Sequence, residues 1–156
     1  MKVMCDDVTT IFVDGEQRNV DGTGKYDQLA TLQIPASTAA IGIQCHNVLG
    51  EHGIMVQVED LAGNELTVTD DTWRCSNKAQ EGWSTAKFRE DNTWQEPAYK
   101  SNVWNWKVSP STKIIWTKNG ADSTVYCRKV LPMPQPGERF RALIPGYRAP
   151  NNNILM

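Results

Sequence analysis

The stretch AIGIQC at residues 40–45 places Ile41, Ile43 and Cys45 at alternate positions, with Gly42 and Gln44 between them. Successive side chains of a β-strand point to opposite faces, so the first three residues share one face and the other two share the opposite face. The alternation predicts a strand that turns one apolar face toward a core.

The same period of two recurs along the chain. It is found in residues 10–13, 29–34, 54–59, 66–69, 113–117 and 123–130. Asp14-Gly15 separates residues 10–13 from residues 16–20, and an Asp-Gly pair between two such runs is typical of a tight β-hairpin. No window of eleven residues carries apolar side chains at helical spacing. Short strands separated by turn residues predict an all-β sandwich or barrel.

Length and charge restrict the class of protein further. The 156 residues suit one domain, and 16 Lys plus Arg against 18 Asp plus Glu give a net charge of −2. Nucleic acid is not an expected partner, because it selects for a concentrated basic surface. No apolar run approaches the roughly 18 residues of a membrane span, and residues 1–7 contain no apolar run, so neither a span nor a signal peptide is expected.

The character of the sequence changes after residue 131. Residues 132–156 contain five prolines, with Arg139, Arg141 and Arg148 among apolar side chains. Proline at this density excludes a central strand or a helix. We therefore divide the chain into a β-sandwich at residues 1–131 and a proline-rich tail at residues 132–156, which wraps the sandwich, stays flexible or docks on a partner.

The four cysteines, Cys5, Cys45, Cys75 and Cys127, lie 40, 30 and 52 residues apart. No two have the CxxC spacing of a zinc or thioredoxin-like site. The even number fits two disulfides or four buried thiols, and two disulfides can pair in three ways. Because the cysteines lie in strand-like segments, where a bridge can cross a sandwich, two disulfides and an oxidising compartment are favoured.

Six segments carry a recurring order of strands, aspartates and tryptophans. They are residues 5–15, 40–47, 53–58, 69–76, 82–83 and 88–98, and the last three contain Trp73, Trp83 and Trp94. This order resembles the galactose-binding-like domains found in rhamnosidases, β-galactosidases and invertebrate lectin-like proteins. The resemblance covers residues 5 to about 130 and implies an antiparallel jelly-roll β-sandwich.

The resemblance also bears on the cysteines and on function. The related modules attached to enzymes lack cysteines at these places, which favours an extracellular, animal-type version and the pairs Cys5–Cys45 and Cys75–Cys127. It implies a secreted, lectin-like protein with glycans as partners. Because one fold hosts many functions, this expectation rests on analogy.

A sugar site needs an aromatic face for the apolar side of a pyranose and planar polar groups for its hydroxyls. Loops at one end of the sandwich are expected to supply them, because strand residues make core and ladder contacts. Trp83 is the favoured stacking ring, since Gly82 and Ser84 beside it suggest an exposed turn, whereas Trp73 and Trp94 are expected in the core. The candidate carbohydrate-binding residues are His46, Asn47, Glu51, His52, Trp83, Arg89, Asp91 and Asn92.

Catalytic or metal-binding chemistry is not expected. His46 and His52 flank Glu51, but a spacing of six suits neither a helical nor a strand metal pair. The acidic pairs at residues 6–7, 70–71 and 90–91 lie at strand ends or turns, where Asp carboxylates accept backbone N–H bonds. No G-x-S-x-G motif or glycine-rich phosphate loop occurs. We expect a non-enzymatic protein with no cofactor and no bound metal.

The alternative is a structural, matrix or protein-interaction module on the same β-sandwich. A proline-rich tail, a surface of mixed charge and disulfides suit it equally well, and homo-oligomerisation is left open. Binding to a glycan array would favour the lectin-like hypothesis, and concentration-dependent assembly without sugar would favour the alternative.

Overall fold

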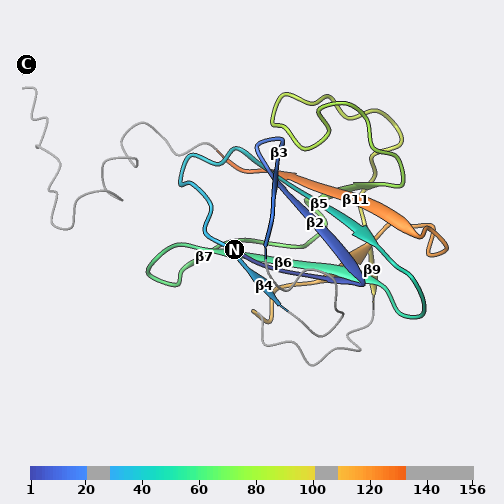
Figure 1. Ribbon diagram of the computed structural model, residues 1–156, viewed down its shortest axis with the longest axis horizontal. Helices are drawn as coiled ribbons and strands as arrows, with labels where there is room; N and C mark the ends of the chain where they lie inside the picture. The colour runs from blue at the N-terminus through green and yellow to red at the C-terminus, as the bar shows by residue number, and fades with distance from the viewer. Residues whose placement is uncertain (21–28, 101–108, 133–156) are drawn as a thin grey trace, which may run out of the picture.

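The computed structural model describes residues 1–20, 29–100 and 109–132. These residues form eleven β-strands and no helix. The strands make two antiparallel sheets that pack face to face, and Figure 1 shows β2, β5 and β11 in one layer with β6 in the other. The all-β sandwich expected from the alternating pattern is confirmed. The tail at residues 133–156 lies outside the described residues.

Strand order differs from chain order in both sheets. The first sheet has the order β4 (Ala30–Thr31), β1 (Lys2–Asp6), β6 (Gly53–Glu59), β10 (Ile114–Trp116) and β9 (Ala98–Lys100), with β7 (Glu65–Val68) also paired to β6. The second sheet has the order β3 (Glu16–Arg18), β2 (Val8–Val13), β5 (Ala40–His46), β11 (Thr124–Val130) and β8 (Arg74–Ser76). Each sheet therefore joins strands that are distant in sequence.

The hairpin between β2 and β3 forms where Asp14-Gly15 predicts it. Asp14 has a φ of 51° and Gly15 a φ of 87°, which are the two positive values that a two-residue type I′ turn requires. The Asp14 carboxylate accepts hydrogen bonds from the backbone N–H groups of Ala39 and Ala40, both at 2.8 Å. The turn is thereby fastened to the start of β5.

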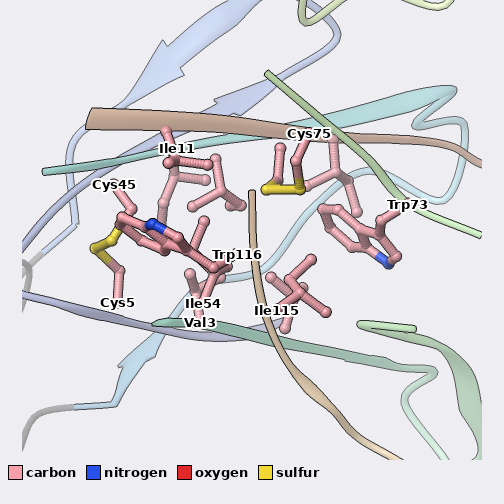
Figure 2. Packing of buried hydrophobic residues seen from close by; sticks show 14 of the residues in the cluster. Val3, Cys5, Ile11, Cys45, Ile54, Trp73, Cys75, Ile115 and Trp116 are labelled. Carbon is pink, nitrogen blue, oxygen red and sulfur yellow. A yellow bond between two sulfur atoms is a disulfide. The ribbon is translucent and has the colours of Figure 1, made fainter. Parts of the chain in front are cut away.

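The space between the sheets holds the inner core. Ile41, Ile43 and Cys45 of β5 are fully buried there, as their alternation predicts. Figure 2 shows two further landmarks of this core, Trp116 and Trp73, on opposite sides of the cluster. Because strands on both sides contribute side chains to one continuous cluster, the inner core is what holds the two sheets together.

Both disulfides expected from the resemblance are present. Cys5–Cys45 links β1 to β5 and therefore crosses from one sheet to the other. Cys75–Cys127 links β8 to β11, which are neighbours within one sheet and place the two cysteines directly opposite each other. Two formed disulfides are compatible with an oxidising environment.

The outer face of the second sheet is covered by residues 77–97. Figure 1 shows this green-to-yellow stretch looping out beyond β5 and β11, on the side away from β6. It contributes rings to an aromatic cluster, a name we use for Phe12, Trp83, Phe88, Trp94 and Tyr126. The sandwich therefore has a second apolar layer outside its inner core.

Arg128 of β11 fastens this covering segment to the sheet. Its guanidinium is buried and donates to the carbonyl oxygens of Trp83 and Thr85, at 2.7 Å each. It also pairs with the Glu90 carboxylate and lies over the Phe88 ring, with the guanidinium carbon 5.3 Å from the ring centre. The buried charge is thus satisfied by groups that all belong to residues 77–97.

Candidate functional site

An open groove of about 390 Å³ lies between three segments, at residues 75–78, 92–96 and 117–122. Its lining is mostly polar and rich in side-chain amides. The residues that line it are Cys75, Ser76, Asn77, Lys78, Asn92, Thr93, Gln95, Glu96, Thr117, Lys118, Asn119 and Asp122. A groove with this lining suits a polar ligand that offers many hydroxyl groups.

Asp122 is the most highly connected side chain in the groove. Its carboxylate accepts hydrogen bonds from Asn77 Nδ2 at 3.1 Å, Asn119 Nδ2 at 2.9 Å and Thr117 Oγ1 at 2.7 Å. These donors come from two of the three segments, so the carboxylate ties the groove walls together and holds the two amides in fixed orientations. The amide oxygens are thereby oriented before a ligand arrives, which lowers the entropy lost on binding.

Other groove side chains remain available to a ligand. The side chain of Asn92 is exposed and makes no hydrogen bond within the described residues, and its backbone oxygen accepts one from Gln95 Nε2. Lys78 and Lys118 have exposed ammonium groups that form no ion pair among the described residues. The unpaired amide and the two unpaired ammonium groups can donate hydrogen bonds to the hydroxyl oxygens of a sugar.

Of the eight carbohydrate-binding candidates, the structure places only Asn92 in the groove. Asp91 lies beside it, where hydrogen bonds from Thr93 and then from Gln80 hold the pKa of its carboxyl below the ordinary value. Arg89 is exposed on the same segment but does not line the groove. The Asp91 carboxylate therefore shapes the turn before the groove wall.

The second group of candidates runs from His46, the last residue of β5, to His52, just before β6, and it lies beside residues 123 and 124. His46 Nδ1 is 2.7 Å from Thr124 Oγ1, and the Asn47 N–H donates to the Ser123 oxygen at 2.8 Å. The structure thus brings this loop next to the 117–122 segment. The two candidate groups share one end of the sandwich, although only one of them contributes to the groove.

His52 is half-buried, whereas Glu51 is exposed. The His52 ring lies 4.7 Å from the Trp116 ring, centre to centre. Burial, together with the nearby Lys100 charge, lowers the pKa of His52. At neutral pH the imidazole is therefore uncharged. Its contact with Trp116 shows that this end of the loop packs against the inner core.

The prediction that Trp83 is an exposed ring is wrong. Its side chain is 7% exposed and lies in the aromatic cluster, stacked on Trp94 with ring centres 5.8 Å apart. Phe12 and Tyr126 contact it edge-on at 5.2 and 5.4 Å. Gly82 has the positive φ of a turn, but the turn directs the following ring onto the sheet. Trp83 therefore offers no free face to a sugar, while burial of Trp73 and Trp94 is confirmed.

One member of each acidic pair takes the structural role expected for a turn carboxylate. Asp7, Asp70 and Asp91 accept backbone N–H bonds from Val48, Thr72 and Thr93 respectively. Glu90 differs, because it pairs with Arg128. Within residues 1–20, 29–100 and 109–132, no group of three or more His, Cys, Asp or Glu side chains is placed to hold a metal ion.

The amides of Asn77, Gln95 and Asn119 line the groove but are not marked as site residues by any motif in the sequence. Residues 119–122, Asn-Gly-Ala-Asp, have the composition of a turn, but nothing in their sequence shows that the pairing of β8 with β11 brings them next to residues 75–78. The groove forms because the strand order places segments that are distant in the sequence next to one another.

Comparisons with protein-family models, with curated proteins and with solved structures find no match for this chain. Within the described part of the chain, no helix is long and apolar enough to cross a membrane. The two-sheet sandwich and the polar groove are therefore the features on which a functional hypothesis can rest.

Proposed function

We propose that the protein is a non-catalytic, lectin-like carbohydrate-binding module, built on a galactose-binding-like jelly-roll sandwich, and that its sugar lies in the groove at residues 75–78, 92–96 and 117–122. The observation that carries the proposal is the amide-rich groove, in which Asp122 orients two of the amides. Planar amides and a carboxylate pair well with the adjacent hydroxyls of a sugar ring.

Secretion is part of the same proposal. The two disulfides support it, because such bonds persist in oxidising compartments and are rare in the cytosol. Extracellular glycans are then the partners that the module meets.

One observation favours the alternative, a structural or protein-interaction module. The loop between β5 and β6 exposes Val48 and Leu49, at 60% and 83%, beside Val8 at 45%. An apolar loop tip of this kind is a typical contact for another protein. Sedimentation over a range of protein concentrations, without sugar, distinguishes the two hypotheses, because the alternative expects assembly and the lectin-like proposal does not require it.

The decisive experiment is a glycan array probed with the full chain, with and without calcium, followed by calorimetry on the best ligand. Asn92→Ala should weaken binding by about tenfold, because it removes one hydrogen-bonding amide from the groove. Asn19→Ala is the matched control, since Asn19 is exposed at the end of the β2–β3 hairpin and should not alter affinity.

Both variants should melt within a few degrees of the parent protein, because neither side chain is buried. An array with no bound glycan, or an affinity that Asn92→Ala and Asn19→Ala leave equally unchanged, would contradict the proposal.

A further inference from the structure

Among the residues that the structure describes, Tyr99 is the one aromatic residue with an exposed side chain. Its side chain is 52% exposed, whereas every other phenylalanine, tyrosine or tryptophan in residues 1–20, 29–100 and 109–132 is buried or half-buried. It lies on β9, which is the edge strand of its sheet. A ring that remains half-exposed at a sheet edge can offer a face to the apolar side of a sugar, which Trp83 cannot.

A second depression lies beside Tyr99. This hollow of about 360 Å³ is bordered by Met55, Tyr99, Lys100, Pro110, Thr112, Lys113 and Ile114. Met55 and Ile114 are each 4% exposed and form one apolar cluster with Met4, so the floor is apolar. The hollow thus joins an apolar surface to polar groups at its border, which is typical of ligand sites.

Thr112 gives an independent indication of a ligand. The side chain is 9% exposed, and its Oγ1 is buried without a hydrogen-bonding partner among the described residues. Its backbone N–H, by contrast, donates to the Ser109 oxygen at 3.0 Å. A buried hydroxyl without a partner is costly, and a hydroxyl from a ligand in the hollow would satisfy it.

The groove and the hollow lie at the two ends of the same pair of strands. Groove residues Glu96 and Thr117 adjoin β9 and β10 at one end, and hollow residues Lys100 and Ile114 are directly paired at the other. Tyr99, paired with Ile115, lies between these ends, and its side chain leaves the face of β9 opposite to that of Lys100. Because β9 is at the sheet edge, a ligand that contacts both the Tyr99 ring and the hollow passes around this edge. Three residue steps along extended chain lead from Glu96 to Tyr99, a distance of about 10 Å at 3.3 Å per step.

We propose that the groove, Tyr99 and the hollow form one continuous track that binds an extended oligosaccharide, and not a single terminal sugar. Tyr99 stacks on a sugar unit in the middle of the track, amides hold the unit in the groove, and the Thr112 hydroxyl pairs with the unit in the hollow. Lys113 donates from the border of the hollow, where its exposed ammonium has no ion pair among the described residues. This inference rests on the proposed carbohydrate-binding function and specifies its ligand.

Affinity as a function of chain length tests the track. Linear glucan, mannan, xylan and galactan oligosaccharides of one, two, four and six units are titrated into the full chain by calorimetry. For the sugar type that binds, the four-unit ligand should bind at least about tenfold more tightly than the single unit, because it contacts both depressions and Tyr99.

Three variants test whether the gain in affinity with ligand length comes from contacts along the track. Tyr99→Ala and Thr112→Val should each remove most of the gain from two to four units and leave the affinity for the two-unit ligand unchanged, whereas Asn92→Ala should weaken both ligands. Leu61→Ala is the control, since Leu61 is fully exposed on the turn after β6, outside both depressions. Thr112→Val nearly preserves side-chain volume and removes an unpaired hydroxyl, so a structural role alone predicts unchanged or raised stability and no change in affinity.

The outcomes separate this inference from the proposed function. Equal affinity for one and for four units, or a length gain that survives Tyr99→Ala and Thr112→Val, would overturn the track and leave the groove as a single-sugar site. Absence of binding at every length for all four sugar types would overturn the track, and the carbohydrate-binding proposal falls with it only if the glycan array also shows no bound glycan.

Discussion

The inner core and the aromatic cluster are two apolar layers on opposite faces of one sheet, and they are built in different ways. Strand side chains that alternate along the sequence dominate the inner core. In the aromatic cluster, Phe12 and Tyr126 come from strands, whereas Trp83, Phe88 and Trp94 come from the irregular segment at residues 77–97. The first layer has a sequence period and the second has none.

This difference shows that an irregular segment can be held in place as firmly as a strand. Residues 77–97 are held by ring contacts and by the Arg128 guanidinium, and this segment also carries the groove wall at residues 92–96. The aromatic cluster therefore supports the candidate site, whereas the inner core supports the fold.

The largest expected effect comes from truncating the central ring of the aromatic cluster. Trp83→Ala should lower the free energy of unfolding by about 3–5 kcal/mol, since it leaves a cavity between Phe12, Trp94 and Tyr126. Chemical denaturation measures the change. Tyr99→Ala is the matched control, because removing a half-exposed ring should change stability by less than about 1 kcal/mol.

Equal losses in the two variants would contradict the assignment of Trp83 to a packed layer. If Trp83→Ala lowers the free energy of unfolding but leaves the hydrogen-exchange protection of β5 and β6 unchanged, the two layers unfold separately.

The disulfides probe the inner core at two places. Replacing Cys5 and Cys45 together by alanine, or Cys75 and Cys127 together, should each cost about 2–4 kcal/mol. The closed loops span 40 and 52 residues, so loop-closure entropy makes the two costs equal to within a few tenths of a kcal/mol. A larger difference, measured by urea unfolding of the two variants, would show that the bridge between sheets and the bridge within a sheet differ in packing.

The parts of the fold that follow a sequence period were predictable. The alternation in β5 and β6 and the Asp-Gly turn after β2 identified strands that the structure contains. The strands β1, β8 and β9 were not identified. The last two have only three residues each, too few to display a period, and all but the first residue of β1 are buried, so its two faces do not differ.

The candidate site was less predictable for a related reason. The neighbours Gly82 and Ser84 suggested an exposed turn at Trp83. The position of the ring depends instead on Gly42, which lies 41 residues earlier and leaves room for it. Asn92 was identified because it lies in a polar loop, whereas Asn77 and Asn119 meet only through the strand order. Local sequence shows which residues are polar but not which segments meet.

A smaller effect is expected where the aromatic cluster contacts the sheet backbone. A Cβ added to Gly42 would lie 2.6 Å from Ser84 Cβ and 2.8 Å from a Trp83 ring carbon, so Gly42→Ala should cost about 1–3 kcal/mol. In the Trp83→Ala background the same change should cost less, because one of the two clashes is gone. A double-mutant cycle by thermal unfolding measures the coupling, and strict additivity would show that the ring does not rest on Gly42.

The last effect concerns a charge, depends on pH and separates the two layers in another way. Arg128, beneath the aromatic cluster, is buried beside the Glu90 carboxylate, whereas Asp6, next to Cys5, is buried near the like charges of Asp7 and Glu51. Burial, reinforced by Asp7 and Glu51, raises the pKa of Asp6 to about 7. The folded protein therefore keeps a proton on Asp6 that the unfolded chain releases near pH 4.

The sign of the pH dependence follows from this proton. Between about pH 4 and pH 7 the folded state binds more protons than the unfolded state, so the Asp6 contribution to stability falls as pH rises, by at most about 1.4 kcal/mol per unit, and is constant above pH 7. Asp6→Asn should remove this slope and make the variant more stable than the parent at pH 8 but not at pH 4. Urea unfolding of both proteins at pH 4, 5, 6, 7 and 8 measures the difference, and comparing the two cancels the contributions of groups common to both proteins, such as His52. Asp7→Asn should act in the opposite direction at neutral pH, since the Val48 N–H holds the pKa of Asp7 below its ordinary value and that hydrogen bond stabilises its charged form. A parent and an Asp6→Asn variant with parallel pH profiles would show that Asp6 ionises normally, and that neither layer contains an unpaired acid.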